Sequence, residues 1–165
     1  MSRFLRFIPL VISLATSGWA SAQEDPRIES LSQLDRSYMA NQRQQIVDLA
    51  ARHLGRGITG DTDRDLAVLQ ALLDRGIVRD TDEETLQAMG FVLGDLLADD
   101  LDMQWVVYED SVGRSRALFY RPTDTYLFPV TMISRRRAVG NDTSVADIYQ
   151  RAHDIVTSSI PPPPF

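Results

Sequence analysis

Apolar residues recur at intervals of three or four positions through most of residues 28–99, as they do on one face of an amphipathic α-helix. The first run covers residues 28–54 and ends just before Gly55, a residue type that commonly follows the last turn of a helix. The pattern predicts a helix over this run, although the polar residues 40–45 leave open a division into two pieces.

Two further helices are predicted on the same grounds. One follows Gly60 and stops at Gly76, with its leucines on one face. The next begins at Thr81, because Thr81 and Glu84 have the spacing of a capping box, in which each side chain satisfies a free backbone N–H group. This third helix is expected to reach about Asp99.

Gly90 and Gly94 lie four positions apart inside the third predicted helix, so they share one side of it. Glycine destabilises a helix interior by about 1 kcal/mol relative to alanine. Two glycines on one side therefore predict close packing against a neighbouring segment.

The pattern changes from helical to extended after the third helix. Residues 103–109 are rich in aromatic and β-branched residues, and short turns lead from them into residues 114–121 and then 126–134, which predicts a three-stranded antiparallel meander. Pro129 has no N–H group to donate, so the third strand should lie at an edge or be interrupted there. A last helix is predicted over residues 144–156.

The order of three helices, three strands and one helix predicts an α+β fold, in which the C-terminal helix packs on one face of the sheet. The 165 residues fit one domain, which we assign to residues 23–157. Consecutive prolines near the C-terminus make residues 158–165 a Pro-rich tail that we expect to be flexible.

The first 22 residues have the organisation of a signal peptide. A short positively charged start precedes an apolar run over residues 7–15, which is too short to span a bilayer comfortably. Ala20-Ser21-Ala22 offers the small residues that a signal peptidase accepts, so cleavage is expected after Ala22. The expected product is periplasmic or secreted and has no transmembrane anchor. An uncleaved N-terminal anchor is the alternative.

Composition narrows the chemistry that this product can carry. The chain has no cysteine, which excludes disulfides, thiolate metal sites and a cysteine nucleophile. All 17 basic residues are arginine, which excludes Schiff-base and P-loop lysines. The formal net charge of −6 disfavours nucleic acid as a partner, because a phosphate backbone would be repelled. No cofactor is expected.

An ordered set of short segments gives the chain a likeness to one bacterial family. The segments are residues 69–70 with 73–74, then 86–95, 103–110, 113–114 and 127–136. Together they resemble the family catalogued as domain of unknown function 3806, over roughly residues 43–155. The resemblance implies a shared fold, but it implies no activity and designates no catalytic residue.

Clusters of acidic residues raise the question of a cation site or of acid–base chemistry. Residues 61–65 contain three aspartates at the spacing that opens a calcium loop, but the rest of that loop is missing, so we interpret them as helix-capping acids. Residues 99–102 and 109–110 are interpreted as ordinary acids of helix ends and turns. His53 and His153 have no further ligand at zinc-binding spacing, so no metal site is expected.

Residues 135–137 are three consecutive arginines on an otherwise acidic chain. With the arginines of the neighbouring strand, Arg114 among them, they could grip a carboxylate or phosphate group bidentately. The simpler interpretation is that these arginines pair with the chain's own acids, including Glu109 and Asp110. Trp105 and Phe128 have apolar neighbours, which favours core positions for both.

The leading expectation for function is a small non-enzymatic binding or interaction module of the bacterial cell envelope, which engages a protein or an anionic envelope ligand through an Arg-rich sheet edge. One alternative is an envelope hydrolase that works through carboxylates such as Asp95, Glu109 and Asp110. Another is an inhibitor or immunity-type protein. The sequence indicates no oligomeric state and no catalytic residue. The candidate binding residues are Trp105, Glu109, Asp110, Arg114, Arg135, Arg136 and Arg137.

Overall fold

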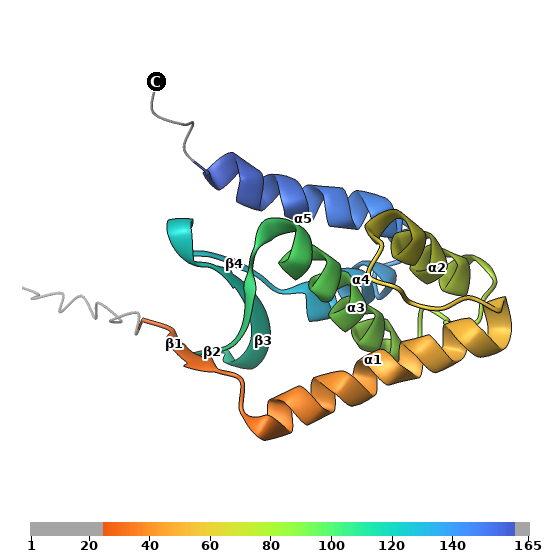
Figure 1. Cartoon of the computed structure of the whole chain (residues 1–165), viewed down its shortest axis with the longest axis horizontal. Helices are drawn as coiled ribbons and strands as arrows, with labels where there is room; N and C mark the ends of the chain where they lie inside the picture. Colours follow the sequence, from red (N-terminus) through yellow and green to blue (C-terminus); the bar gives the residue numbers. More distant parts are fainter. Residues whose placement is uncertain (1–24, 161–165) are drawn as a thin grey trace, which may run out of the picture.

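Five α-helices and a four-stranded antiparallel sheet form the fold of residues 25–160, the part of the chain that the computed structural model describes (Figure 1). The predicted α+β class is confirmed. The predicted signal peptide, residues 1–22, lies outside the described residues, as do residues 161–165 of the predicted tail. In chain order the elements are β1 (Arg27–Ser30), α1 (Gln33–Leu54), α2 (Thr62–Asp74), α3 (Glu83–Leu101), β2 (Gln104–Asp110), β3 (Gly113–Tyr120), the 3-10 helix η1 (Arg121–Thr123), β4 (Thr125–Leu127), the 3-10 helix η2 (Pro129–Thr131), α4 (Met132–Arg137) and α5 (Val145–Ser159).

The start of the chain departs from the predicted helix over residues 28–54. Residues 27–30 form β1, which pairs antiparallel with β2, and α1 begins only after it. A strand of four residues is too short to show a clear period of two, and it forms here because β2 supplies its hydrogen-bond partners. The polar residues 40–45 do not divide α1, and Gln42 within them is buried on its inner face.

Helices α2 and α3 form where the sequence predicts them. Asp61 caps α2, because its side chain accepts a hydrogen bond from the backbone N–H group of Arg64. The capping box predicted at Thr81 does not form. The N-cap of α3 is Asp82, whose carboxylate accepts from the N–H group of Arg79 instead.

The sheet has the strand order β1-β2-β3-β4, one strand more than predicted, and all neighbouring strands are antiparallel. The third predicted strand, residues 126–134, is extended only at its start. It stops at Leu127, and Pro129 opens the 3-10 turn that leads into α4. The prediction that Pro129 interrupts an edge strand is confirmed, because proline cannot donate a ladder hydrogen bond.

The C-terminal helix α5 packs mainly against α2 and α3, and among the strands its main contact is with the edge strand β4 (Figure 1). It therefore packs more on helices than on a face of the sheet, which differs from the prediction. Ser144 caps the helix by accepting from the N–H group of Asp147. The helix continues to Ser159, past the predicted domain boundary at residue 157.

Helix α3 lies at the centre of the core, which the apolar faces of α2, α3 and α5 fill. Gly90 and Gly94 allow the close packing that their spacing predicts. A Cβ atom on Gly90 would lie 2.5 Å from the carbonyl oxygen of Val130, and one on Gly94 would overlap the ring of Trp105. The segment before α4 can therefore lie directly on α3.

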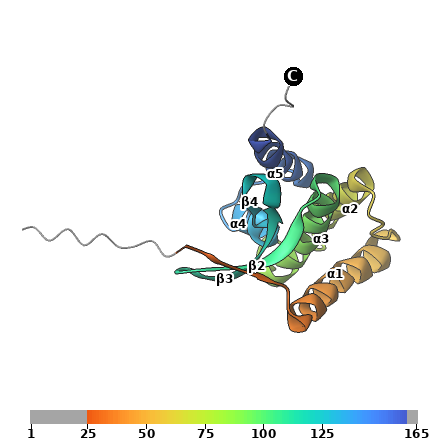
Figure 2. The same cartoon turned by 60° about the vertical axis from the view of Figure 1, so that its left-hand side comes forward.

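Strands β2 and β3 form a hairpin that projects from the helices, with β1 along its outer edge (Figure 2). Asp110 holds the turn, because its Oδ1 atom accepts from the N–H groups of Val112 and Gly113. Val112 at the tip is 94% exposed. Between residues 25 and 160, no helix is both long and apolar enough to cross a membrane.

Candidate functional site

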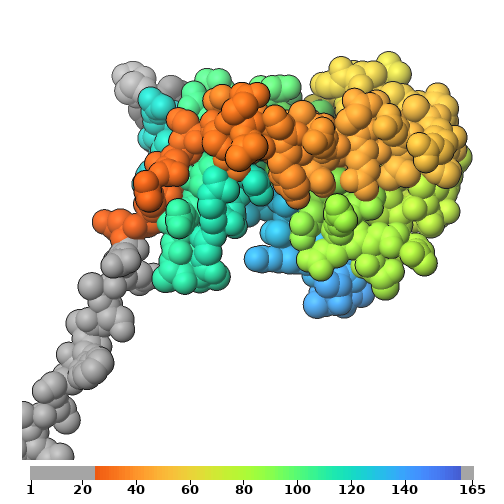
Figure 3. All heavy atoms as spheres, turned by 90° about the horizontal axis from the view of Figure 1, so that it is seen from below, coloured from red at the N-terminus to blue at the C-terminus, as the bar shows by residue number. Residues whose placement is uncertain are grey.

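A cavity of about 470 Å³ opens between the β2–β3 hairpin and the helices. Figure 3 shows it as a hollow between the green hairpin and the yellow-green start of α3, beneath the orange α1. Three arginines contribute to its lining: Arg114 and Arg116 from β3, and Arg135 from α4. Four aromatic side chains contribute as well: Tyr38, Phe91, Tyr108 and Phe128. The lining therefore combines cationic and aromatic groups.

Asp35 of α1 fixes two of these arginines in place. Its carboxylate accepts a bidentate pair of hydrogen bonds from Arg114, at 3.1 and 2.9 Å, and two from Arg116, at 3.2 and 2.9 Å. The Arg116 guanidinium also lies over the ring of Tyr38, 4.6 Å from its centroid. Because Asp35 is only 2% exposed, these contacts fasten the hairpin to the start of α1 from beneath the surface.

The carboxylate of Asp35 also caps α1. The Ser32 hydroxyl accepts from the N–H group of Asp35, while the Asp35 carboxylate accepts from the N–H group of Ser32. Hydrogen bonds from Arg114 and Ser32 hold the pKa of Asp35 well below its usual range, although burial acts in the opposite direction. Asp35 is therefore ionised at neutral pH.

Arg114 lies among several acids. Its hydrogen bonds to Asp35, together with the charges of Asp35, Glu109 and Glu29, raise the pKa of the Arg114 guanidinium above its already high ordinary value. The cation of Arg114 is thus largely balanced by the protein itself.

The three consecutive arginines lie on α4 and not at the sheet edge where the sequence places them. Successive residues of a helix point in different directions, so these side chains do not form one patch. Arg135 lines the cavity, whereas Arg136 donates to the Met132 carbonyl oxygen at 2.6 Å. Arg137 pairs with Asp142 at 2.9 Å. Within residues 25–160, Arg135 forms no ion pair with a carboxylate.

The other predicted binding residues are divided between different places. Asp110 lines the cavity, while Glu109 does not and instead stands opposite Arg27 and Arg114 on the neighbouring strands. The structure therefore brings Asp110, Arg114 and Arg135 together and leaves Glu109, Arg136 and Arg137 outside the cavity lining.

Trp105 lies at a second cavity, of about 540 Å³, which Arg43 and Asp95 also line. Its indole N–H group donates to Asp95 at 2.9 Å, and Arg43 donates to the same carboxylate. Trp105 is half-buried and packs against the core, as predicted. Phe128, by contrast, is half-buried at the lining of the first cavity.

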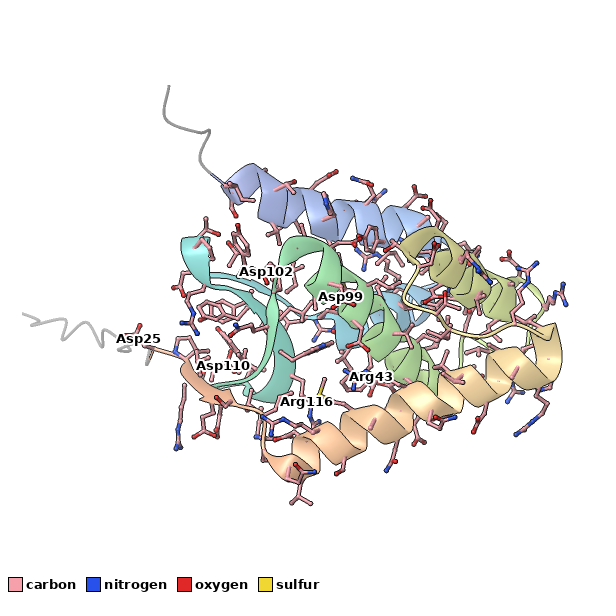
Figure 4. The ribbon with its side chains drawn as sticks, viewed as in Figure 1. Asp25, Arg43, Asp99, Asp102, Asp110 and Arg116 are labelled. Atoms are coloured by element: carbon pink, nitrogen blue, oxygen red, sulfur yellow. The ribbon has the colours of Figure 1, made fainter. Side chains whose placement is uncertain are left out.

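The acids between α3 and β2 do not converge on the first cavity. Asp102 and Asp110 lie at opposite ends of β2, and Figure 4 shows Asp99 and Asp102 at the end of α3, away from Asp110 and Arg116. Within residues 25–160, no group of three histidine or acidic side chains is arranged to hold a metal ion.

Two other acids serve the packing of the helices. Asp65 is fully buried, and its carboxylate accepts from the N–H groups of Thr59 and Gly60. Asp100 accepts from the hydroxyl of Tyr149, which ties α5 to the end of α3. Burial, followed by the contact with Asp100, raises the pKa of the Tyr149 hydroxyl.

Sequence reasoning misses two residues of α1: Tyr38, which lines the first cavity, and Asp35, which binds two of the lining arginines. The spacing of Ser32 and Asp35 is that of a capping box and could have marked the start of the helix at Ser32. The pairing of Asp35 with Arg114 joins distant parts of the chain and leaves no local signal.

Comparisons with known proteins give a family and a fold. A family model described as "Domain of unknown function (DUF3806)" matches residues 65–149. A solved structure from Bacteroides thetaiotaomicron VPI-5482 is similar, with a TM-score of 0.72 and 17% sequence identity. The similarity covers 81% of this chain and 49% of that one, so this chain spans about half of its length. At this identity the likeness concerns the fold alone. No curated protein matches the sequence.

Proposed function

This chain belongs to the domain of unknown function 3806 family, and we propose that it acts as an exported, non-enzymatic binding module of the bacterial cell envelope that engages an anionic group in the cavity beside α4. The family supplies no activity to transfer, so the proposal depends on the site. We refer to the cavity lined by Arg114, Arg116 and Arg135 as the arginine cavity.

The observation that carries the proposal is the position of Arg135. Arg135 is an exposed residue at the lining of a concave site, and no carboxylate within residues 25–160 forms an ion pair with it. An arginine presents five donors in a planar fork, which matches a carboxylate or phosphate group. On a chain with a formal net charge of −6, such a cation at a cavity supports recognition of an anion.

The arrangement of the carboxylates supports binding more than hydrolysis. A glycosidase-type mechanism needs two acids on either side of one bond. Asp95 and Asp110 line different cavities, and Glu109 lines neither of the two. Asp110 is moreover engaged in holding the hairpin turn. The alternative of an inhibitor or immunity-type protein differs from this proposal mainly in its partner.

The proposal can be tested by capture of envelope components on the immobilised protein. Arg135→Gln removes the unpaired cation, and Arg136→Gln is a matched control because that neighbouring arginine binds its own helix and does not line the cavity. Components that depend on the arginine cavity should be retained by the wild type and by Arg136→Gln, and lost from Arg135→Gln. If all three proteins captured the same envelope components, the arginine cavity would not be the binding site.

A further inference from the structure

We infer that the arginine cavity takes a small monoanion that carries an aromatic ring, with an aromatic carboxylate as the simplest case. This inference rests on the proposed function, because it names the ligand class of the same site. It is carried by the aromatic side chains, the charge and the size of the cavity together.

Aromatic side chains from separate parts of the chain meet at this cavity. Tyr38 of α1 packs edge-on against Phe91 of α3, with ring centroids 5.8 Å apart. Tyr108 of β2 packs edge-on against Phe128, with centroids 5.2 Å apart. Aromatic rings favour such contacts at about 4.5–7 Å. A planar ring bound here could make further aromatic contacts with these side chains, whereas an aliphatic or sugar ligand would make fewer ring–ring contacts.

The charges around the cavity favour one negative charge on the ligand. Arg114 and Arg116 share the carboxylate of Asp35, and Asp110 adds a second carboxylate at the turn. The charges of Glu29 and Glu109 also act on Arg114. Arg135 is therefore the guanidinium of the lining that has no carboxylate partner among residues 25–160. A single carboxylate matches this one unpaired cation, whereas a phosphate dianion would place a second negative charge among the acids around the cavity.

The size of the cavity favours a small molecule or a chain end over a folded surface. Its volume of about 470 Å³ lies in the lower part of the range of about 300–1,000 Å³ that is usual for small-molecule sites. Tyr38 at its lining is 39% exposed, and Val112 at the hairpin tip adds an exposed apolar rim. A free aromatic acid and the C-terminal aromatic residue of a peptide share the chemistry that would fit.

The test is a set of calorimetric titrations of the purified protein with four probes. Phenylacetate carries both the ring and the charge, phenylacetamide only the ring, and acetate only the charge. N-acetylphenylalanine represents a peptide end. We expect phenylacetate to bind at least about tenfold more tightly than phenylacetamide and acetate. Tighter binding of N-acetylphenylalanine than of phenylacetate would assign the natural source to a peptide, and the reverse order to a free acid.

Two variants test whether the ligand binds in the arginine cavity. They also separate the inference of an aromatic ligand from the proposed anion binding. Arg135→Gln should weaken phenylacetate at least about tenfold, while Arg136→Gln should stay within about twofold of the wild type. If acetate and phenylacetate bind with equal affinity and both need Arg135, the inference of an aromatic ligand is overturned, but the proposed anion binding stands. The aromatic-ligand inference and the proposed anion binding would both be overturned if phenylacetamide bound as tightly as phenylacetate. Equal affinities of the wild type, Arg135→Gln and Arg136→Gln for phenylacetate would also overturn both.

Discussion

Asp35 has two structural roles. It completes the capping box at the start of α1, and it accepts hydrogen bonds from two arginines of β3. Its side chain is 3% exposed, whereas those of Arg116 and Arg114 are 27% and 44% exposed. The carboxylate thus stabilises the helix and at the same time holds two arginines at the lining of the cavity.

The first prediction concerns Asp35→Asn. The substitution removes the buried negative charge and leaves two arginines without their counter-ion. We therefore expect the free energy of unfolding to fall by about 2 kcal/mol. Both arginines are partly exposed, which keeps this loss below that of a fully buried ion pair. Chemical denaturation measures the change. Asp147→Asn is the matched control, because Asp147 also accepts from the N-cap serine of its helix but is bound to no arginine within residues 25–160. Equal losses in both variants would show that the arginines add nothing.

The same carboxylate predicts a dependence of stability on pH. The pKa of Asp35 is lower in the folded protein than in the unfolded chain, so its contribution is complete above about pH 4, the ordinary value for aspartate. It is lost as the pH falls below that value. Denaturation at pH 5 and pH 3 should therefore show a larger loss of stability on acidification for the wild type than for Asp35→Asn. Parallel pH profiles would contradict this assignment.

At the scale of single residues, sequence predicts helix caps only in part. The interpretation of residues 61–65 as helix-capping acids is confirmed at Asp61, whereas the capping box expected at Thr81 does not form. The partner of Arg114 was expected among its neighbours, Glu109 and Asp110, yet Asp35 binds it most directly. Such a partner depends on how the hairpin folds against α1, which no local spacing encodes.

Among the elements, α3 shows most clearly how the sequence determines packing. Gly90 and Gly94 predict a close neighbour, and the structure supplies it as the segment of Pro129 and Val130. What the sequence cannot give is the conformation of that neighbour. Its apolar and β-branched composition favours a strand, but proline ends the strand, and the chain continues as 3-10 and α-helix against α3.

Gly90→Ala should therefore destabilise the protein. The new Cβ atom would lie 2.5–2.7 Å from backbone atoms of Pro129 and Val130, which cannot move as a side chain can. We expect a loss of about 2 kcal/mol, after allowance for the better helix propensity of alanine. Gly57→Ala is the control, because a Cβ atom at that position would have no neighbour within 4 Å among residues 25–160. A Gly90→Ala variant as stable as Gly57→Ala would show that α3 can shift away.

For the whole molecule, export is a proposal that the position of β1 makes testable. Cleavage after Ala22 would leave β1 intact, because the strand begins at Arg27. Expression of the full chain in a Gram-negative host should yield a periplasmic product whose N-terminal residue is Gln23, as intact-mass spectrometry would show. A product that keeps residues 1–22 and stays with the cytoplasmic fraction would contradict both export and cleavage.

The central claim is that this acidic protein binds an anion in the arginine cavity through Arg135. The most direct measurement is an NMR titration of ¹⁵N-labelled protein with sodium acetate, with sodium chloride at matched ionic strength as the reference. Acetate should shift the Nε–H resonance of Arg135 saturably, together with the amides of Ser115 and Arg116 in the same lining, and chloride should not. An Arg135 resonance that responds equally to both salts, or shifts confined to residues outside the arginine cavity, would contradict the claim.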